Sequence, residues 1–249
     1  MKKFQLITFS MGVMLLAGVL LTACKKSNFD NTNPEVAGLM SFNLVRDKSV
    51  ILGLSGSALN STPLAFTNYT GGYQSIYPGN RTFESYDYIT QDSLATTAFA
   101  FEVNKYYSAF VVGSEGAYQN VIVNDNFDSL SGSSGKAYVR YINAIDGSVS
   151  AAVTITNGGT PVSHNAAFAS VSEFTEVNPG DITIAVNEGS SINASRTITV
   201  EQKTVYTVLL LSGAATADPA QIKYITNGTL DGETAGQRTT SSAKSVSIN

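Results

Sequence analysis

Hydrophobic residues follow two different patterns along this chain. Residues 4–21 form a mostly apolar run, whereas many later apolar residues alternate with polar ones. From Ile182 to Val186, for example, isoleucine or valine occupies every second position. Alternation with a period of two places the apolar side chains on one face of a half-buried β-strand. Beyond the first run there is no long stretch of helical periodicity, so the sequence predicts a body made of β-strands.

Turn residues and one long apolar run support this prediction. Residues 206–211 are mainly apolar, as expected for a strand that is covered on both faces. Pro179-Gly180 precedes the alternating strand, and Asn157-Gly158-Gly159 follows another apolar stretch; both favour turns. Short strands separated by turns about every ten residues are typical of an immunoglobulin-like sandwich.

Two halves of the chain carry the same landmarks in the same order. Residues 37–45 open the first half and residues 137–145 open the second. Further pairs follow at similar spacing: Phe66 with Phe168, Pro78-Gly79 with Pro179-Gly180, and residues 107–113 with residues 206–213. A repeat of about a hundred residues has the size of a domain rather than of a solenoid unit. We therefore predict an all-β protein with two tandem immunoglobulin-like β-sandwich domains.

The beginning of the chain has the pattern of an export signal. Met1-Lys2-Lys3 supplies positive charge before the apolar run, and Leu21-Thr22-Ala23-Cys24 follows it. Positive charge at this position stays on the cytoplasmic side during export. The last four residues resemble the lipobox of bacterial lipoproteins. The resemblance implies that Cys24, the only cysteine of the chain, receives a diacylglyceryl thioether and becomes the mature N-terminus after cleavage.

The alternative is an uncleaved membrane anchor, because the apolar run is close to the lower length limit of a spanning helix. A plain anchor has no need of a cysteine at position 24, so the lipoprotein interpretation is favoured. Acyl chains gain about 0.8 kcal/mol for each methylene that they bury in a membrane. Lys25 replaces the aspartate of the enterobacterial sorting rule, which by resemblance favours the outer membrane, as a periplasmic or surface-facing lipoprotein of the cell envelope.

These patterns divide the chain into six predicted segments. Residues 25–35 are polar and rich in turn formers, residues 129–135 are rich in serine and glycine, and residues 231–249 are again polar. The predicted segments are the signal peptide at 1–23, a flexible tether at 24–35, the first sandwich at 36–128, a linker at 129–135, the second sandwich at 136–230 and a polar tail at 231–249.

The second half resembles a bacterial family, the domain of unknown function 4397 (DUF4397). The residues that carry the resemblance are Val139 to Ala144, Ala167-Phe168, Ser172 to Phe174, Pro179-Gly180 and Tyr206 to Val208. The first half looks like a divergent member, with Met40 where the second half has Arg140. The resemblance implies an exported or surface-located β-sandwich. It transfers no activity and no catalytic residue.

Composition limits the classes of partner. The formal net charge is −4, and only 14% of the residues are charged, whereas tyrosine and phenylalanine number 12 each. Nucleic-acid binding needs clustered lysine and arginine, so no nucleic-acid partner is expected. With Cys24 used for lipid attachment, the mature chain has no cysteine left for a disulfide.

The sequence contains few residues of the types that catalysis and metal binding require. His164 is the only histidine and follows Pro161 in an expected hairpin loop, so we predict no catalytic residue and no enzyme activity. Residues 124–128 (NDNFD) are rich in oxygen ligands that suit calcium, but such short runs more often form turns that bond their own backbone. We therefore predict no metal site and no cofactor.

Two surface features remain as candidate sites. Exposed tyrosines can stack on sugar rings or contribute to protein interfaces, although tyrosine is also common in ordinary strands. Ser93 and Ser129 lie in Asp-Ser-Leu triplets, which resemble a short acceptor pattern for O-glycosylation of exported bacterial proteins. The candidate ligand-binding tyrosines are Tyr69, Tyr73, Tyr77, Tyr86 and Tyr88.

Together these features predict a lipid-anchored envelope protein that is not an enzyme. We expect an adhesion or protein-interaction module that is held at the membrane through its N-terminal lipid and binds an envelope or extracellular protein. The alternative is a carbohydrate-binding accessory lipoprotein that uses the tyrosines to bind a glycan.

Overall fold

The computed structural model describes residues 35–157, 161–215 and 217–230, which belong to one compact unit beginning at Glu35. The predicted signal peptide, nearly all of the tether and the tail lie outside the described residues. Within the described part of the chain, no helix is long and apolar enough to cross a membrane.

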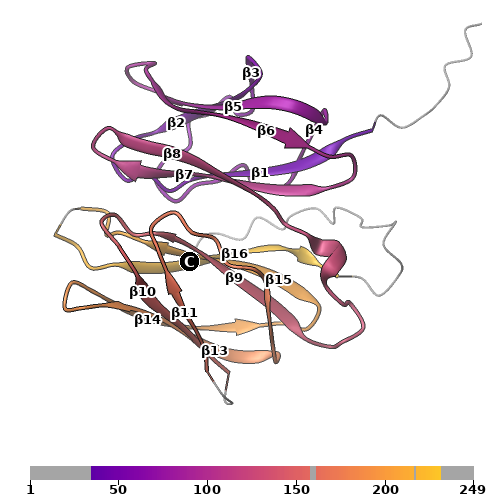
Figure 1. Ribbon diagram of the computed structural model, residues 1–249, viewed down its shortest axis with the longest axis vertical. Coiled ribbons are helices and arrows are strands. Elements are labelled where there is room, and N and C mark those ends of the chain that lie inside the picture. The colour runs from indigo at the N-terminus through magenta and orange to yellow at the C-terminus, as the bar shows by residue number, and fades with distance from the viewer. Residues whose placement is uncertain (1–34, 158–160, 216, 231–249) are drawn as a thin grey trace, which may run out of the picture. The chain divides into compact units, whose positions relative to one another are not determined.

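The first eight strands form one sandwich (Figure 1). They are β1 (Ala37–Asn43), β2 (Val50–Leu54), β3 (Ser57–Ala58), β4 (Gln74–Ile76), β5 (Gly79–Asp87), β6 (Ser93–Phe101), β7 (Tyr106–Ser114) and β8 (Ala117–Asn124). A short 3-10 helix, η1 (Phe127–Ser129), follows β8 and precedes the second sandwich.

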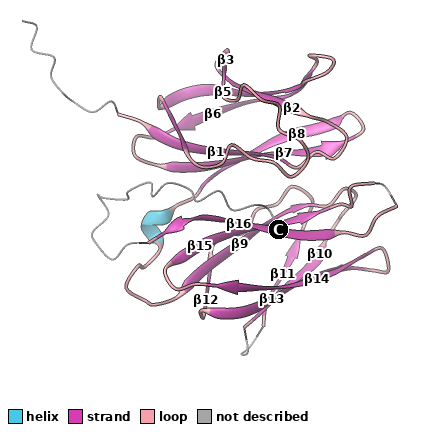
Figure 2. Cartoon of the chain, turned by 180° about the vertical axis from the view of Figure 1, so that it is seen from behind, coloured by secondary structure: helices cyan, strands magenta, loops and turns pink. Residues whose placement is uncertain are grey.

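The next eight strands form the second sandwich (Figure 2). They are β9 (Ala137–Ala144), β10 (Ala151–Thr156), β11 (Val162–Ala166), β12 (Thr175–Val177), β13 (Gly180–Glu188), β14 (Ile192–Val200), β15 (Thr204–Leu211) and β16 (Gln221–Thr229).

Each sandwich consists of two four-stranded sheets with the same connectivity. The sheets of the first have the orders β4-β1-β7-β8 and β3-β2-β5-β6, and those of the second have the orders β12-β9-β15-β16 and β11-β10-β13-β14. In both, the first strand pairs in parallel with the seventh, β1 with β7 and β9 with β15. The predictions of an all-β chain and of two tandem sandwiches are confirmed.

Strand register shows which residues of the two copies are equivalent. Leu39 of β1 lies opposite Tyr107 of β7, and Val139 of β9 lies opposite Tyr206 of β15. Both tyrosine hydroxyls accept a hydrogen bond from a backbone N–H five residues earlier, at 2.9 Å from Glu102 and 3.0 Å from Glu201. This geometry is that of the tyrosine corner of immunoglobulin-like sandwiches.

A buried asparagine near the end of the first strand of each copy forms the same hydrogen bonds. The Asn43 side chain donates to the Leu64 carbonyl, and the Asn143 side chain donates to the Ala166 carbonyl. Each asparagine also accepts, through Oδ1, the backbone N–H two residues later. Both side chains are fully buried, so these bonds satisfy loop groups that water cannot reach.

Three apolar clusters explain the strand patterns. One lies inside each sandwich, and alternate residues of β13 (Ile182, Ile184 and Val186) contribute to the second. The third cluster joins residues of both sandwiches, including Phe42 and Phe110 of the first and Ile142 and Leu209 of the second. Every residue of β15 is buried: one face contacts its own core, and on the other Leu209 and Leu211 join this shared cluster while Val205 joins a further cluster with Phe127 and Tyr138.

Replacement of Asn143 by alanine should lower the free energy of unfolding by about 3 kcal/mol, because it leaves several buried N–H and C=O groups without partners. Asn165→Ala, an exposed change on β11, is the matched control and should change stability little. Urea unfolding followed by circular dichroism measures both. Equal stability of the two variants would contradict the role assigned to Asn143.

Candidate functional site

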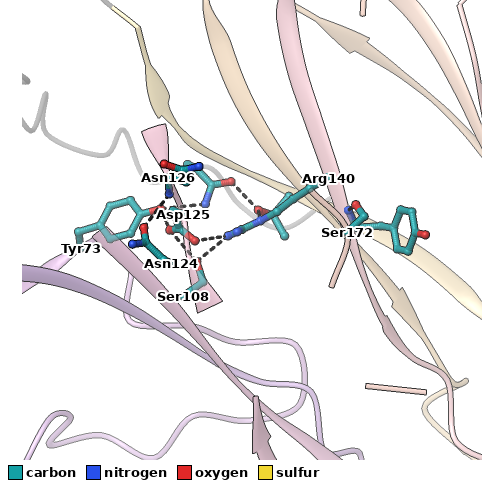
Figure 3. Close-up of polar contacts among 10 residues, drawn as sticks. Tyr73, Ser108, Asn124, Asp125, Asn126, Arg140 and Ser172 are labelled. Atoms are coloured by element: carbon teal, nitrogen blue, oxygen red, sulfur yellow. Dashed lines mark hydrogen bonds and ion pairs between the residues drawn. The ribbon is translucent and has the colours of Figure 1, made fainter. Parts of the chain in front are cut away.

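A group of buried polar side chains lies between the two sandwiches. The sheet β4-β1-β7-β8 and the sheet β12-β9-β15-β16 supply the shared apolar cluster, and a polar group adjoins it (Figure 3). Its centre is Arg140, a charged residue in a strand whose eight residues are all buried. Only 2% of Arg140 is exposed.

Arg140 contacts residues of both sandwiches. Its Nη2 lies 2.6 Å from Oδ1 of Asp125 and donates to the Ser108 hydroxyl at 2.8 Å. Its Nε donates to the Thr207 hydroxyl at 3.0 Å, and its guanidinium carbon lies 4.5 Å from the centre of the Phe174 ring. The arginine therefore connects strands β7 and β15 through hydrogen bonds while its plane stacks on an aromatic ring.

Asp125 is completely buried and accepts hydrogen bonds from two further hydroxyls. Ser108 donates to its Oδ2 at 2.9 Å, and the Tyr73 hydroxyl donates to the same oxygen. The Tyr73 hydroxyl in turn accepts a hydrogen bond from the Asn227 amide at 3.0 Å. Burial, followed by the charge of Asp125, raises the pKa of Tyr73 well above its usual value, so at neutral pH this residue is a hydrogen-bond donor.

In each copy, a hydroxyl of the seventh strand bonds a polar side chain of the same sandwich. Ser108 and Thr207 occupy equivalent positions, opposite Met40 and Arg140 respectively. Ser108 bonds Asp125 in the first sandwich, and Thr207 bonds Asn227 at 2.7 Å in the second. The copies therefore contribute similar surfaces, but one supplies the cation and the other the anion.

A further contact shows the approximate two-fold character of this interface. Arg46 and Asp146, which lie at equivalent positions one hundred residues apart, approach each other to 3.5 Å between Nε and Oδ2. Contact between equivalent residues is expected close to a two-fold axis of an isologous interface. The two sandwiches thus meet as the halves of a symmetric dimer would.

This polar group is suited to holding the two sheets together rather than to chemistry on a ligand. Its hydroxyls, amide, carboxylate and guanidinium bond one another, and its ion pair is shielded from water. Sequence reasoning missed it because Arg140 and Asp125 belong to different copies. The available signal was a lone charge within an otherwise apolar strand.

The candidate calcium run forms structural contacts instead. The Asn124 side chain accepts the backbone N–H of Asn126 at 2.8 Å, which is a turn that bonds its own backbone. Asp125 pairs with Arg140, and Asp128 pairs with Lys105 at 2.8 Å. Across the described ranges, no group of three or more His, Cys, Asp or Glu side chains could hold a metal ion.

The five candidate tyrosines do not act together. Tyr69 stacks on Phe42, with ring centroids 5.4 Å apart, and Tyr73 is taken up by the buried polar group. Tyr77, Tyr86 and Tyr88 remain outside these contacts. Tyr77 is 70% exposed before one end of β5, whereas Tyr86 and the 49% exposed Tyr88 lie at the other end. Among the described residues, no ring contact joins any two of the five.

The remaining candidate residues lie on strands or short turns. His164 is in β11, paired with Val153 of β10, so its expected loop position is wrong. The hairpin strand β11 begins at Val162, directly after Pro161, and its pairing with β10 includes His164. Its ring lies edge-on to Tyr141, with centroids 6.2 Å apart. Ser93 is exposed at the start of β6, and exposed Ser129 in η1 donates to the Asn126 carbonyl.

Comparison with known families agrees with the internal duplication. A sequence profile described as "Domain of unknown function (DUF4397)" matches residues 42–148 and again residues 137–239. The chain belongs to the DUF4397 family. The two DUF4397 matches overlap at 137–148, a segment that contains the whole of β9 with Arg140. A comparison with curated proteins found no match.

In this DUF4397 protein, Arg140→Met should lower the free energy of unfolding by about 3–5 kcal/mol, because it leaves the Asp125 carboxylate buried without its cation. The double variant Arg140→Met with Asp125→Asn should recover most of this loss, since neither charge then remains. Urea unfolding of the two single variants and the double variant gives the coupling energy.

Lys105→Met is the matched control, because it breaks the more exposed pair with Asp128 and should cost no more than about 1 kcal/mol. A coupling energy near zero between Arg140 and Asp125 would contradict the assigned role of the buried pair.

Proposed function

We propose that this protein is a lipoprotein of the bacterial cell envelope that acts as an adhesion or protein-interaction module and not as an enzyme. Cys24 would anchor it to the outer membrane through its lipid, and residues 25–35 would provide reach. The two sandwiches would present strand edges and loops to an envelope or extracellular protein.

The observation that supports an interaction role is that the buried polar side chains bond one another, while the outer sheets keep a face outside the contact between the sandwiches. The buried group around Arg140 and Asp125 bonds within itself and joins two sheets. The outer sheets β3-β2-β5-β6 and β11-β10-β13-β14 keep one face outside this contact. Such a rigid body with free edges and loops is suited to recognition, although the fold alone does not define the partner.

The anchoring part of the proposal rests on the residues around Cys24. Labelled palmitate should be incorporated into the full chain in a bacterial host, and Cys24→Ser should abolish the incorporation, because the thiolate is the nucleophile that takes the lipid. Ser27→Ala, a change three residues later, is the control and should be labelled normally. Label that persists in Cys24→Ser would refute lipid attachment at this residue.

A second candidate function is glycan binding at the end of β5. Tyr86 lies opposite Ile51 of β2, and Tyr88 follows two residues later. Tyr88 lies in the turn that follows β5, so both rings are found at the same end of the strand, where aromatic faces can stack on sugar rings. The protein would then bind sugar rings by stacking, with neighbouring polar groups bonding their hydroxyls.

A glycan array tests this alternative with the full chain. Binding that is lost in the double variant Tyr86→Ala/Tyr88→Ala would support it, since both stacking surfaces are removed. Tyr77→Ala removes an exposed ring near the opposite end of the same strand and should leave such binding intact. Binding that is unchanged in the double variant would exclude this surface as the glycan platform.

A further inference from the structure

The strand β6 is an unusual edge. It is the outer strand of the sheet β3-β2-β5-β6, and its nine residues, SLATTAFAF, include no charge and no proline (Figure 1). Only Phe101 is buried, and Phe99 is half-buried. Proteins usually protect a long edge with a charge, a proline or a covering segment, because its free backbone groups can pair with another strand.

The backbone of β6 pairs on one side only. It pairs with β5 from Phe101 opposite Gly79 to Ala95 opposite Ser85, and after an irregularity at Leu94 the pairing ends with Ser93 opposite Tyr86. Within the described ranges, no backbone hydrogen bond joins β6 to any other strand. Every second N–H and C=O of an edge strand points away from its neighbour, so β6 can accept a further strand.

The second sandwich shows what protection of this edge looks like. Its equivalent strand is β14, in which Arg196 lies opposite Ile184. Arg196 extends to the neighbouring sheet, donating to the Ile222 carbonyl at 2.9 Å and lying 5.4 Å from the Tyr224 ring centre. An inward-pointing charge of this kind discourages strand addition. The equivalent residue of β6 is Thr97, opposite Phe83.

The edge strand of the facing sheet, β8 or β16, also differs in charge between the two copies. Strand β8, which lies beside β6, also has no charged residue. Its counterpart β16 carries Lys223, whose ammonium donates to the Thr67 hydroxyl at 3.2 Å. The strands β6 and β8 of the first sandwich therefore carry no charged residue, whereas β14 and β16 of the second carry Arg196 and Lys223.

We propose that β6 is a self-association surface, at which the β6 edges of two copies of this chain pair antiparallel about a two-fold axis. This inference rests on the proposed interaction function and names its partner as a second copy. Antiparallel pairing would join two four-stranded sheets into one sheet of eight strands, and the closed symmetry would prevent growth into fibres.

The sequence of β6 fits its own reversed copy. With the axis at Thr97, a large residue meets a small one in the outer pairs, Leu94 with Ala100 and Phe99 with Ala95. Thr96 meets Ala98, and Thr97 meets its own copy. No like charges oppose each other in this register. Like charges directly opposite each other would destabilise the pairing.

Cysteine trapping in the full chain tests the pairing. Single cysteines are placed at positions 95 to 99 in turn, because only a residue at the axis faces its own copy closely enough for a disulfide. We expect one position, Thr97→Cys for this register, to give a dimer on non-reducing electrophoresis that dithiothreitol removes. Thr197→Cys on β14, the counterpart of position 98, is the control strand position and should stay monomeric, as should the chain whose only cysteine is Cys24.

A charge variant gives an independent measurement. Thr97→Arg introduces the residue type that β14 uses, so sedimentation should show loss of the dimer, whereas Thr197→Arg should retain it. Thr96→Lys, which points to the exposed face, replaces Thr97→Arg if circular dichroism shows that the latter is unfolded. Dimers in every variant, or no trapped dimer at any β6 position, would overturn the proposal.

These outcomes are separable from the proposed function. Binding of the monomeric protein to envelope proteins, with no trapped dimer, would overturn self-association at β6 and leave the interaction role standing. A trapped dimer with no palmitate label would leave the pairing standing and refute only the lipid anchor.

Discussion

The buried ion pair between Arg140 and Asp125 is the interaction on which the arrangement of the two sandwiches depends. A charge in a water-free environment is costly unless it is paired and its remaining hydrogen-bonding groups are satisfied. Here Ser108, Thr207 and Tyr73 supply those bonds, and they come from both sandwiches. Sliding one sheet over the other would leave several buried groups without partners. The polar group therefore defines the register of a contact that is otherwise apolar and tolerant of displacement.

Duplication makes this device possible. In a symmetric dimer of identical domains, each half would have to carry the same residues on its facing sheet. After duplication, one copy has Met40 and Asp125 while the other has Arg140 and Asn227 at the equivalent positions. The hydroxyl bonds of Ser108 and Thr207 are kept in both. The contact retains the shape of a two-fold interface while its buried charges are divided between the halves, so the cation of one copy neutralises the anion of the other.

Much of the fold can be predicted from local pattern, whereas the site cannot. The alternation around Ile184, the Pro-Gly turns and the runs at 107–113 and 206–213 are short-range features, and they identify strands and the repeat. Tyr73 shows the limit of sequence reasoning. Its neighbours in the sequence suit an exposed sugar-binding platform equally well, whereas in the structure its hydroxyl bonds Asn227, 154 residues away. The all-buried β15 indicates cover on both faces, but a sequence pattern does not say that the second cover is another domain.

The difference between the copies extends from the shared contact to the outer edges. Selection for a closed interface explains why the facing sheets match, but it places no constraint on strands β6 and β14, which lie on the far sheets. Those strands nevertheless differ in the feature that controls strand addition, with Thr97 in one and Arg196 in the other. A protein that needed only a stable double sandwich would gain from a charge at both edges. The unprotected edge is therefore better explained by a use that requires its backbone to remain free.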